Sequence, residues 1–378
     1  MLAATATLPV RRAGQDVAII DMPGDVTDAT ESPLLDALRQ ASKDNARVII
    51  LNLSGLQFLN SSGLGILMEL TARVNRQRKV LLAFGLSDHY QRVFALTRLS
   101  EAIRVYPVED DALAAARVVG GTMPAPVGLA TTGAETSSVT WRDAANWALP
   151  VARLTAPSVP RGGVNLNVDG RRLLSPLHGF GRLWRKTYSI RLSGSPVTPA
   201  GAAAVWKRDF GTFWPGGNYC FGGPAGIAPG EVQVLNLTLM PGMKLYTGVM
   251  VIYADETSFC FLTPEGHMFG GLITFRAIDD GGTTVLQVQP LIRASDPLYE
   301  LTLRLGVGGT MEDRFWRQTL KTLAATFGVQ AEASLEATLI DPGIDWSRAK
   351  NIRYNAAIRT TFYRLAAPLR WLQRRGAR

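Results

Sequence analysis

The stretch Leu59-Asn60-Ser61-Ser62-Gly63-Leu64-Gly65 constrains the chain most, because it joins the most strand-like run of the sequence to a regular helical pattern. Upstream, residues 47–53 form a short apolar run rich in β-branched side chains, which is typical of a buried strand. Downstream, apolar side chains recur at helical spacing, and cations collect where a helix C-terminus favours them. The sequence therefore predicts a strand, a turn and a helix that begins beside Asn60.

Three side chains that can cap a helix, Asn60, Ser61 and Ser62, stand at this expected helix start. A phosphate on either serine would meet unpaired backbone amides and the positive end of the helix dipole, which stabilise negative charge. The same residues are also found at ordinary helix N-caps without further function. Both interpretations follow from the residues alone.

Residues 17–108 resemble a STAS domain of the anti-sigma factor antagonist family. The resemblance rests on the strand Ile49-Leu51-Leu53, the Asn-Ser-Ser-Gly-Leu-Gly turn and the run Met22-Pro23-Gly24-Asp25. In that family, the serine of an Asp-Ser-Ser-Gly-Leu-Gly turn is phosphorylated by a partner kinase that doubles as an anti-sigma factor. The resemblance implies that Ser61 is the phospho-acceptor, with Ser62 as the alternative. Asn60 and Gly63 complete the switch loop, and Asn60 stands where the family usually has Asp.

The first domain is predicted to cover residues 1–118 and to alternate strands with helices. Strands are expected at residues 17–22, 47–53, 79–84 and 103–106, and helices at residues 31–42, 62–77, 87–99 and 109–118. This alternation predicts an α/β fold with a mixed sheet covered by helices. His89, near a helix start beside Asp88, is predicted to be a surface residue.

Length and composition fit a globular chain with more than one core. The 378 residues, of which 47% are hydrophobic, suffice for two or three domains. Cys220 and Cys260 are too few for a disulfide framework and are predicted to be small buried hydrophobes. The first nine residues lack the basic start of a signal peptide, and no apolar run approaches about 18 residues. A cytoplasmic protein is expected.

Glycine and proline punctuate residues 119–162, which show no sustained periodicity and are predicted to be a flexible linker. Within this stretch, residues 141–149 end at Pro150 and are compatible with one short helix. Such a helix would dock Trp141 or Trp147 onto a neighbour, or would be tethered without function.

A second domain is predicted over residues 163–345. Strict alternation at residues 184–192 indicates a strand, Thr198-Pro199 starts a helix, and five further strands follow at residues 232–239, 244–254, 258–263, 269–278 and 283–293. The helix after Asp296-Pro297 is interrupted by Gly306, Gly308 and Gly309 and resumes to Phe327. Residues 329–339 fit an additional edge strand or a helix.

Residues 182–328 resemble the START or polyketide-cyclase-like superfamily, also called SRPBCC, most clearly at residues 199–210 and in the run Gly271-Leu-Ile-Thr-Phe. The resemblance implies an α+β helix-grip fold, in which a curved antiparallel sheet wraps the last helix around a cavity for a lipid or another hydrophobic small molecule. The cavity candidates, which would equally suit an ordinary core, are Tyr246, Tyr253, Phe259, Phe261, Phe269, Phe275 and Trp316.

An enzyme would need convergent acid, base or nucleophilic groups. Glu265 and His267 would suit an acid/base pair or two metal ligands, but Pro264 and Gly266 favour a polar turn there. Further isolated candidates are Asp255, Glu256 and Tyr299. No catalytic, cofactor-binding or metal-binding motif is present, so no catalytic residue, cofactor or metal is predicted.

The tail, residues 346–378, carries the whole charge excess of the chain. It holds nine Lys and Arg and no acid, whereas the formal net charge of the chain is +9. An amphipathic helix kinked at Pro368 is predicted, with an apolar seam of Ile358, Phe362, Leu365, Leu369 and Leu372. The candidates for contact with an anionic membrane surface are Arg359, Arg364, Arg370, Arg374 and Arg375. Alternatively, the seam packs on the second domain; nucleic acid is not expected.

These observations predict a regulatory protein without enzymatic activity, in which a STAS phospho-switch is coupled to a domain that binds a hydrophobic ligand. The expected partners are an anti-sigma factor or serine kinase-like protein, a lipid or similar small molecule, and the inner membrane face through the tail. One alternative is a lipid-handling accessory protein in which the STAS domain only docks. A polyketide-cyclase-like enzyme is the third.

Overall fold

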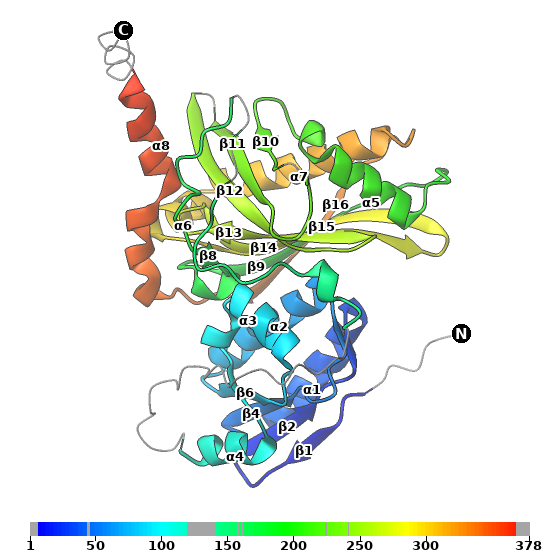
Figure 1. Cartoon of the computed structure of the whole chain (residues 1–378), viewed down its shortest axis with the longest axis vertical. Helices are drawn as coiled ribbons and strands as arrows, with labels where there is room; N and C mark the ends of the chain where they lie inside the picture. Colours follow the sequence, from blue (N-terminus) through cyan, green and yellow to red (C-terminus); the bar gives the residue numbers. More distant parts are fainter. Residues whose placement is uncertain are drawn as a thin grey trace. The chain divides into compact units, whose positions relative to one another are not determined.

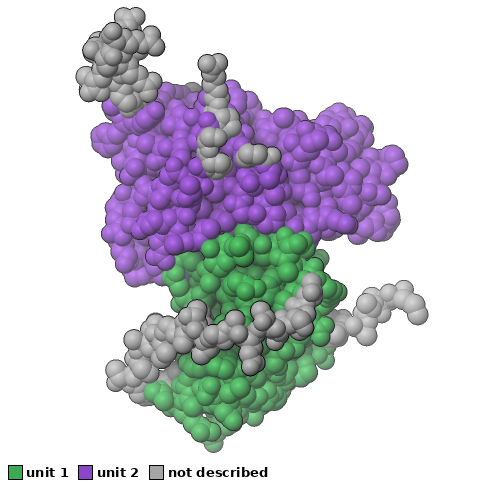
Figure 2. Space-filling model, viewed as in Figure 1, with its two compact units in different colours: residues 1–150 green, residues 151–378 purple. Residues whose placement is uncertain are grey.

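The computed structural model describes residues 7–43, 46–118, 141–156, 159, 162–223, 225–240 and 242–367. The chain divides into two compact units, residues 1–150 and 151–378 (Figure 2). This boundary lies inside the stretch that was predicted to be a linker, residues 119–162. Of that stretch, residues 119–140 lie outside the described part of the chain.

A five-stranded sheet forms the centre of the first unit (Figure 1). Its order is β1 (Val10–Arg12), β2 (Val17–Asp21), β4 (Val48–Asn52), β6 (Val80–Phe84) and β7 (Arg104–Tyr106). Only β1 runs antiparallel to its neighbour. The central strands are apolar except for Asp21 and Asn52 at the ends of β2 and β4, because both faces are buried, and Ile19, Ile50 and Ala83 have no exposed surface. The mixed sheet predicted for this domain is confirmed.

Helices follow the strands much as the periodicity predicts: α1 (Glu31–Lys43), α2 (Ser61–Arg76), α3 (Asp88–Leu96) and α4 (Glu109–Val118). Short 3-10 turns stand at Asp28–Thr30 (η1) and Leu99–Glu101 (η2). Ala112 and Ala116 of α4 pack on one face of the sheet. Small side chains there let the helix approach the strands closely.

A two-residue parallel pair, β3 (Asp25–Val26) and β5 (Phe58–Leu59), lies just before α2. It had no counterpart in the sequence analysis, because two residues carry too little pattern to recognise. The pair brings the chain after β2 beside the turn that opens α2.

The second unit contains a large antiparallel sheet ordered β10-β11-β12-β13-β14-β15-β9-β16, and β8 (Leu173–Leu174) also pairs with β13. Its long strands are β9 (Leu183–Arg191), β11 (Val232–Met240), β12 (Met243–Ala254), β13 (Ser258–Pro264), β14 (Phe269–Asp280) and β15 (Thr283–Ala294). The outer strands are β10 (Tyr219–Phe221) and β16 (Ser334–Asp341), which pairs with β9. Residues 334–341 are thus an edge strand and not a helix.

The helices of this unit are α5 (Pro199–Arg208), α6 (Pro297–Arg304), α7 (Val307–Ala325) and α8 (Ala356–Leu365), with 3-10 turns at Pro176–His178 (η4), Phe210–Phe213 (η5) and Trp346–Tyr354 (η6). Helices α5 and α7 share one core with the sheet. Trp206 of α5 contacts the rings of Phe259 and Phe275, and Trp316 of α7 contacts Phe275. No described helix is both long and apolar enough to cross a membrane.

Candidate functional site

The turn before α2 positions the predicted switch residues. Asn60 is the N-cap of α2, and its side-chain oxygen accepts a hydrogen bond of 2.9 Å from the Gly63 N–H. Ser61 is the first helical residue and only 1% exposed, and its hydroxyl has no hydrogen-bond partner in the described part of the chain. Ser62 is 7% exposed. The capping geometry predicted from the sequence is therefore present.

Position 63 of this turn has room only for glycine. A Cβ on Gly63 would overlap the carbonyl oxygen of Val26 and lie 2.9 Å from the Leu59 side chain. The backbone of β3 therefore passes directly against the first turn of α2. This contact fixes the start of the helix relative to the β3–β5 pair.

Residues 141–148, called here the tryptophan segment, pack beside this turn. The Asp143 carboxylate is fully buried and accepts hydrogen bonds from the Leu59 N–H at 3.3 Å and from the Tyr90 hydroxyl at 3.2 Å. Its oxygens also lie 3.2 Å from His89 Nε2 and accept from Trp147 Nε1 at 3.2 Å. One carboxylate thus connects β5, α3 and the tryptophan segment.

Aromatic and cationic contacts extend this attachment. The Trp141 ring stacks on His89 at 5.9 Å and meets Tyr90 edge-on at 5.3 Å. Trp147 is buried, and its indole N–H also donates to the Leu59 carbonyl at 3.2 Å. Arg142 pairs with Asp25 at 2.6 Å and lies 5.0 Å from the centre of the Phe58 ring.

Burial alone would raise the pKa of Asp143, but the hydrogen bonds and charge that it receives, first from His89 and then from Leu59 and Trp147, outweigh burial and lower it. The carboxylate is therefore ionised at neutral pH. The prediction that His89 is a surface residue is wrong, since it is 6% exposed. Asp143, 54 residues further along the chain, gives it a buried partner.

The predicted short helix over residues 141–149 is reduced to one 3-10 turn, η3 (Ala144–Asn146). The expected docking of Trp141 or Trp147 occurs with both side chains, through the contacts above. Residues 141–148 therefore differ from a flexible linker, because buried side chains tie them to the first unit.

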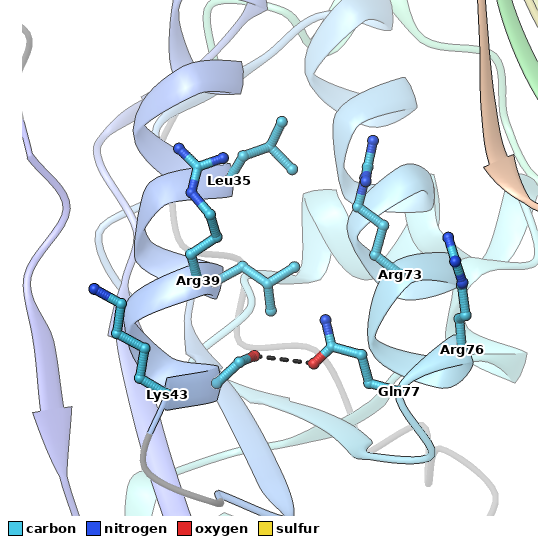
Figure 3. A pocket seen from close by; sticks show the side chains of 8 residues that line it. Leu35, Arg39, Lys43, Arg73, Arg76 and Gln77 are labelled. Atoms are coloured by element: carbon cyan, nitrogen blue, oxygen red, sulfur yellow. Dashed lines mark hydrogen bonds between the residues drawn. The ribbon is translucent and has the colours of Figure 1, made fainter.

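A hollow of about 770 Å³ lies between α1 and α2 (Figure 3). Leu35 and Leu38 line it together with four cations, Arg39, Lys43, Arg73 and Arg76. Ser42 donates to Gln77 across it at 3.0 Å. It lies at the C-terminal end of α2, roughly 20 Å from Ser61 along the helix axis. Sequence reasoning missed it because its cations come from two separate helices.

In the second unit, a cavity of about 710 Å³ lies among β11 to β14, the loop after η5 and α7. Three of the seven aromatic cavity candidates, Phe261, Phe269 and Trp316, line it. The others differ from the expectation: Tyr253, Phe259 and Phe275 have no exposed surface, and Tyr246 contacts Tyr363. Sequence reasoning missed further apolar lining residues from several elements, among them Trp214, Leu235, Leu237, Ile273, Met311 and Phe315.

Three ionisable side chains, His267, Glu312 and Arg314, also line this cavity. Burial lowers the pKa of His267 to about 4, so its ring is neutral at neutral pH. Its Nδ1 lies 3.1 Å from the Phe269 N–H, a buried donor that needs an acceptor, and we assign the ring hydrogen to Nε2 on that basis. Burial raises the pKa of Glu312 to about 7 against the attraction of Lys186, which lies 2.9 Å away.

The loose enzyme candidates do not converge. Glu265 accepts from the Arg172 N–H at 3.3 Å, while His267 bonds to the backbone of Phe269. Asp255 caps its own turn by accepting from Ser258 N–H at 2.7 Å, and the Tyr299 hydroxyl accepts from the Ala357 N–H at 3.0 Å. Among the described residues, no group of three metal-ligating side chains lies together.

Both cysteines are free; Cys260 is buried and Cys220 half-buried. Burial raises the pKa of each thiol to about 12, so neither is a thiolate at neutral pH.

Helix α8 packs through Ala356, Ala357 and Thr360. The described part of the predicted seam faces solvent instead, with exposures of 36% for Ile358, 68% for Phe362 and 71% for Leu365. Arg359 is exposed, and Arg364 donates to the Gly242 carbonyl at 2.5 Å. The other seam residues and candidate cations, Leu369, Leu372, Arg370, Arg374 and Arg375, lie outside the described residues.

Residues 9–112 match the family model of the STAS domain. The anti-sigma-B factor antagonist of Listeria monocytogenes is 25% identical over 105 residues, which cover 28% of this chain and 92% of the relative. The protein of the same name from Staphylococcus aureus is 28% identical over 86 residues, which cover 23% of this chain and 80% of that relative. The first unit thus carries a STAS domain. It is similar to anti-sigma factor antagonists.

Two solved structures match parts of the chain. The crystal structure of an anti-sigma factor antagonist from Mycobacterium paratuberculosis is 25% identical, covers 31% of this chain and 99% of that one, and has a TM-score of 0.27. The crystal structure of protein Ms6760 from Mycobacterium smegmatis is 13% identical, covers 39% of this chain and 92% of that one, and has a TM-score of 0.28.

Proposed function

We propose that this chain is a regulatory protein in which the STAS domain is a phospho-switch at Ser61 and the second unit binds an apolar ligand. The partner of the switch is an anti-sigma factor or serine kinase-like protein. The observation that carries the switch is the Ser61 hydroxyl, which stands at the first position of α2 without a hydrogen-bond partner among the described residues.

The start of α2 suits a phosphate electrostatically. The helix dipole favours negative charge there, and the first turn of α2 contains no acidic residue to oppose it. Asn60, where anti-sigma factor antagonists usually have Asp, caps the helix without adding charge. A phosphate on Ser61 would therefore add negative charge to a helix turn that carries no acidic residue.

Substitutions at Ser61 test the switch. Ser61→Asp is expected to weaken binding of the partner, while Ser61→Ala keeps the chain in its binding form; Ser62→Ala is the matched control at the neighbouring hydroxyl. Each variant, tagged in its own host, is compared by quantitative recovery of the kinase-like partner. Equal recovery with Ser61→Asp and Ser61→Ala would contradict a switch at this residue.

The second unit is proposed to bind its ligand in the 710 Å³ cavity, as expected for a helix-grip domain. This volume falls in the range of about 300–1,000 Å³ typical of small-molecule sites. Aromatic and aliphatic side chains form most of its walls, and its polar groups include the His267 ring, the Glu312 carboxyl and the Arg314 guanidinium. A molecule with an apolar body and an oxygen-bearing head group, such as a fatty acid or a sterol, fits this chemistry.

The alternative, a lipid-handling protein whose STAS domain only docks, is favoured by one observation. Ser61 is 1% exposed, and a hydroxyl so deeply buried is a poor kinase substrate unless its surroundings open. The two functions differ in whether phosphate is found on Ser61 in the cell.

A further inference from the structure

The backbone of Leu59 needs partners beyond its own sheet. Among the described residues, strand β5 pairs with β3 alone, so its other edge presents an N–H and a C=O that an added segment can bind. Side chains of the tryptophan segment take both: Asp143 accepts from the Leu59 N–H, and Trp147 donates to the Leu59 carbonyl. The segment therefore satisfies the backbone hydrogen-bonding groups at this edge of β5 with its own side chains.

The surface around Leu59 has the donors and rings that bind a carboxylate flanked by aromatic side chains. We define the Leu59 surface as Asp25, Phe58, Leu59, His89 and Tyr90. It offers the carboxylate a backbone N–H, a tyrosine hydroxyl and an imidazole nitrogen, all within 3.3 Å. It gives the Trp141 indole one stacked ring, His89, and one edge-on ring, Tyr90, and the Asp25 carboxylate at its rim pairs with Arg142.

The Leu59 surface adjoins the switch. Leu59 lies two residues before Ser61, and the β3–β5 pair also contacts Gly63 in the first turn of α2. A partner that contacts the first turn of α2 from the side of the β3–β5 pair would meet this surface. While the tryptophan segment is bound, Asp143 has no exposed surface and both backbone groups of Leu59 are already engaged.

We propose that the Leu59 surface is a docking site for a peptide segment that carries a carboxylate between aromatic side chains, and that the tryptophan segment occupies it as a competitor of the partner of the switch. The competition rests on the proposed function, whereas the docking site does not. Release of the segment opens the edge of β5 and the approach to Ser61.

A synthetic peptide with the sequence of residues 139–150 tests the docking site on the full chain. In the chain variant Asp143→Ala the built-in segment loses its central contacts, so the peptide is expected to bind at least about tenfold more tightly than to the wild-type chain, where it must compete. A peptide carrying the same Asp143→Ala change is expected not to bind. Asp111→Ala, on the exposed face of α4, is the matched control chain.

Tyr90→Phe provides a second chain variant, which removes one hydrogen bond to Asp143 and keeps the buried ring. Hydrogen exchange at the Leu59 amide is expected to rise in both variants, while β2 and β6 stay protected. If the peptide does not bind the Asp143→Ala chain, or if exchange at Leu59 is unchanged in both variants, the docking site is wrong.

Recovery of the host partner tests the competition. Asp143→Ala is expected to bind the partner more tightly than the wild type does. If the peptide binds as expected but partner recovery is unchanged, the segment is no competitor. If no partner is recovered and no phosphate is found on Ser61, the proposed switch fails, while the peptide result still decides the docking site.

Discussion

At the scale of single residues, the position of Gly63 follows from a close approach of two backbones. The sequence indicates only that Gly63 belongs to a turn. The structure shows why glycine is needed there, because the backbone of β3 lies against the first turn of α2. The same holds for Asp143 and His89. Neither a buried carboxylate nor its partner can be recognised from local pattern when 54 residues separate them.

Substituting Gly63 by Ala is expected to destabilise the STAS domain by about 1–3 kcal/mol, because the new Cβ would overlap the Val26 carbonyl oxygen. Gly55→Ala is the control in the same unit, since its Cβ would make an ordinary contact of 3.8 Å with the Met22 carbonyl oxygen. Chemical denaturation measures both changes. Equal stability of the two variants would show that β3 does not constrain this helix start.

His267 should make the second unit sensitive to acid. Its pKa falls from 6.5 to about 4 on burial, so the unfolded chain binds the proton more readily between these values. Burial of the neutral His267 ring therefore makes the free energy of unfolding depend on pH. The folded state is fully stable above pH 6.5 and loses roughly 3 kcal/mol of stability as pH falls toward 4. His267→Gln cannot titrate. The stability advantage of the wild type over this variant is expected to shrink over that range in denaturation experiments; parallel curves would contradict the burial of a neutral ring.

At the scale of elements, the long helices and strands follow the hydrophobic period closely, whereas the short ones do not. Strand β1, the β3–β5 pair and η3 have two or three residues each, which is too few for a period to emerge. Three glycines were expected to interrupt the helix after Asp296-Pro297, but only one of them does so. Gly306 adopts a left-handed φ of 79° between α6 and α7, whereas Gly308 and Gly309 continue the helix.

Helices α6 and α8 meet through Tyr299 and Ala357, and each leaves apolar side chains in solvent. The exposed residues are Leu298 and Leu301 on α6, Leu305 at its C-cap, and Ile358, Phe362 and Leu365 on α8. Cations stand close by in sequence at Arg304, Arg359 and Arg364. An apolar face flanked by cations is the composition of a peripheral anchor to anionic membranes.

The double variant Phe362→Glu, Leu365→Glu is therefore expected to reduce flotation of the chain with phosphatidylglycerol vesicles, and added salt is expected to weaken flotation of the wild type. Leu149→Glu, at an equally exposed leucine of the first unit, is the control. Equal flotation with phosphatidylcholine vesicles, or no effect of the double variant, would rule out an electrostatic anchor.

At the scale of the whole molecule, the chain combines two different cores, and sequence reasoning located them through different signals. The parallel strands of the first unit are recognised as continuous apolar runs, and the strands of the second as a succession of long antiparallel segments. The cavity was less predictable, because its walls come from elements far apart in sequence and only three of the aromatic candidates reach it. In the proposed function, one unit carries the switch and the other binds the ligand.

Native mass spectrometry of the protein purified from its own host tests this central claim most directly, because one spectrum reports phosphate and bound ligand together. The account predicts a species heavier by one phosphate that disappears in Ser61→Ala and persists in Ser62→Ala. It also predicts a bound apolar molecule that is lost when Met311→Trp fills the cavity. A wild-type chain with phosphate only on Ser62 or on neither serine, and without a bound molecule, would contradict it.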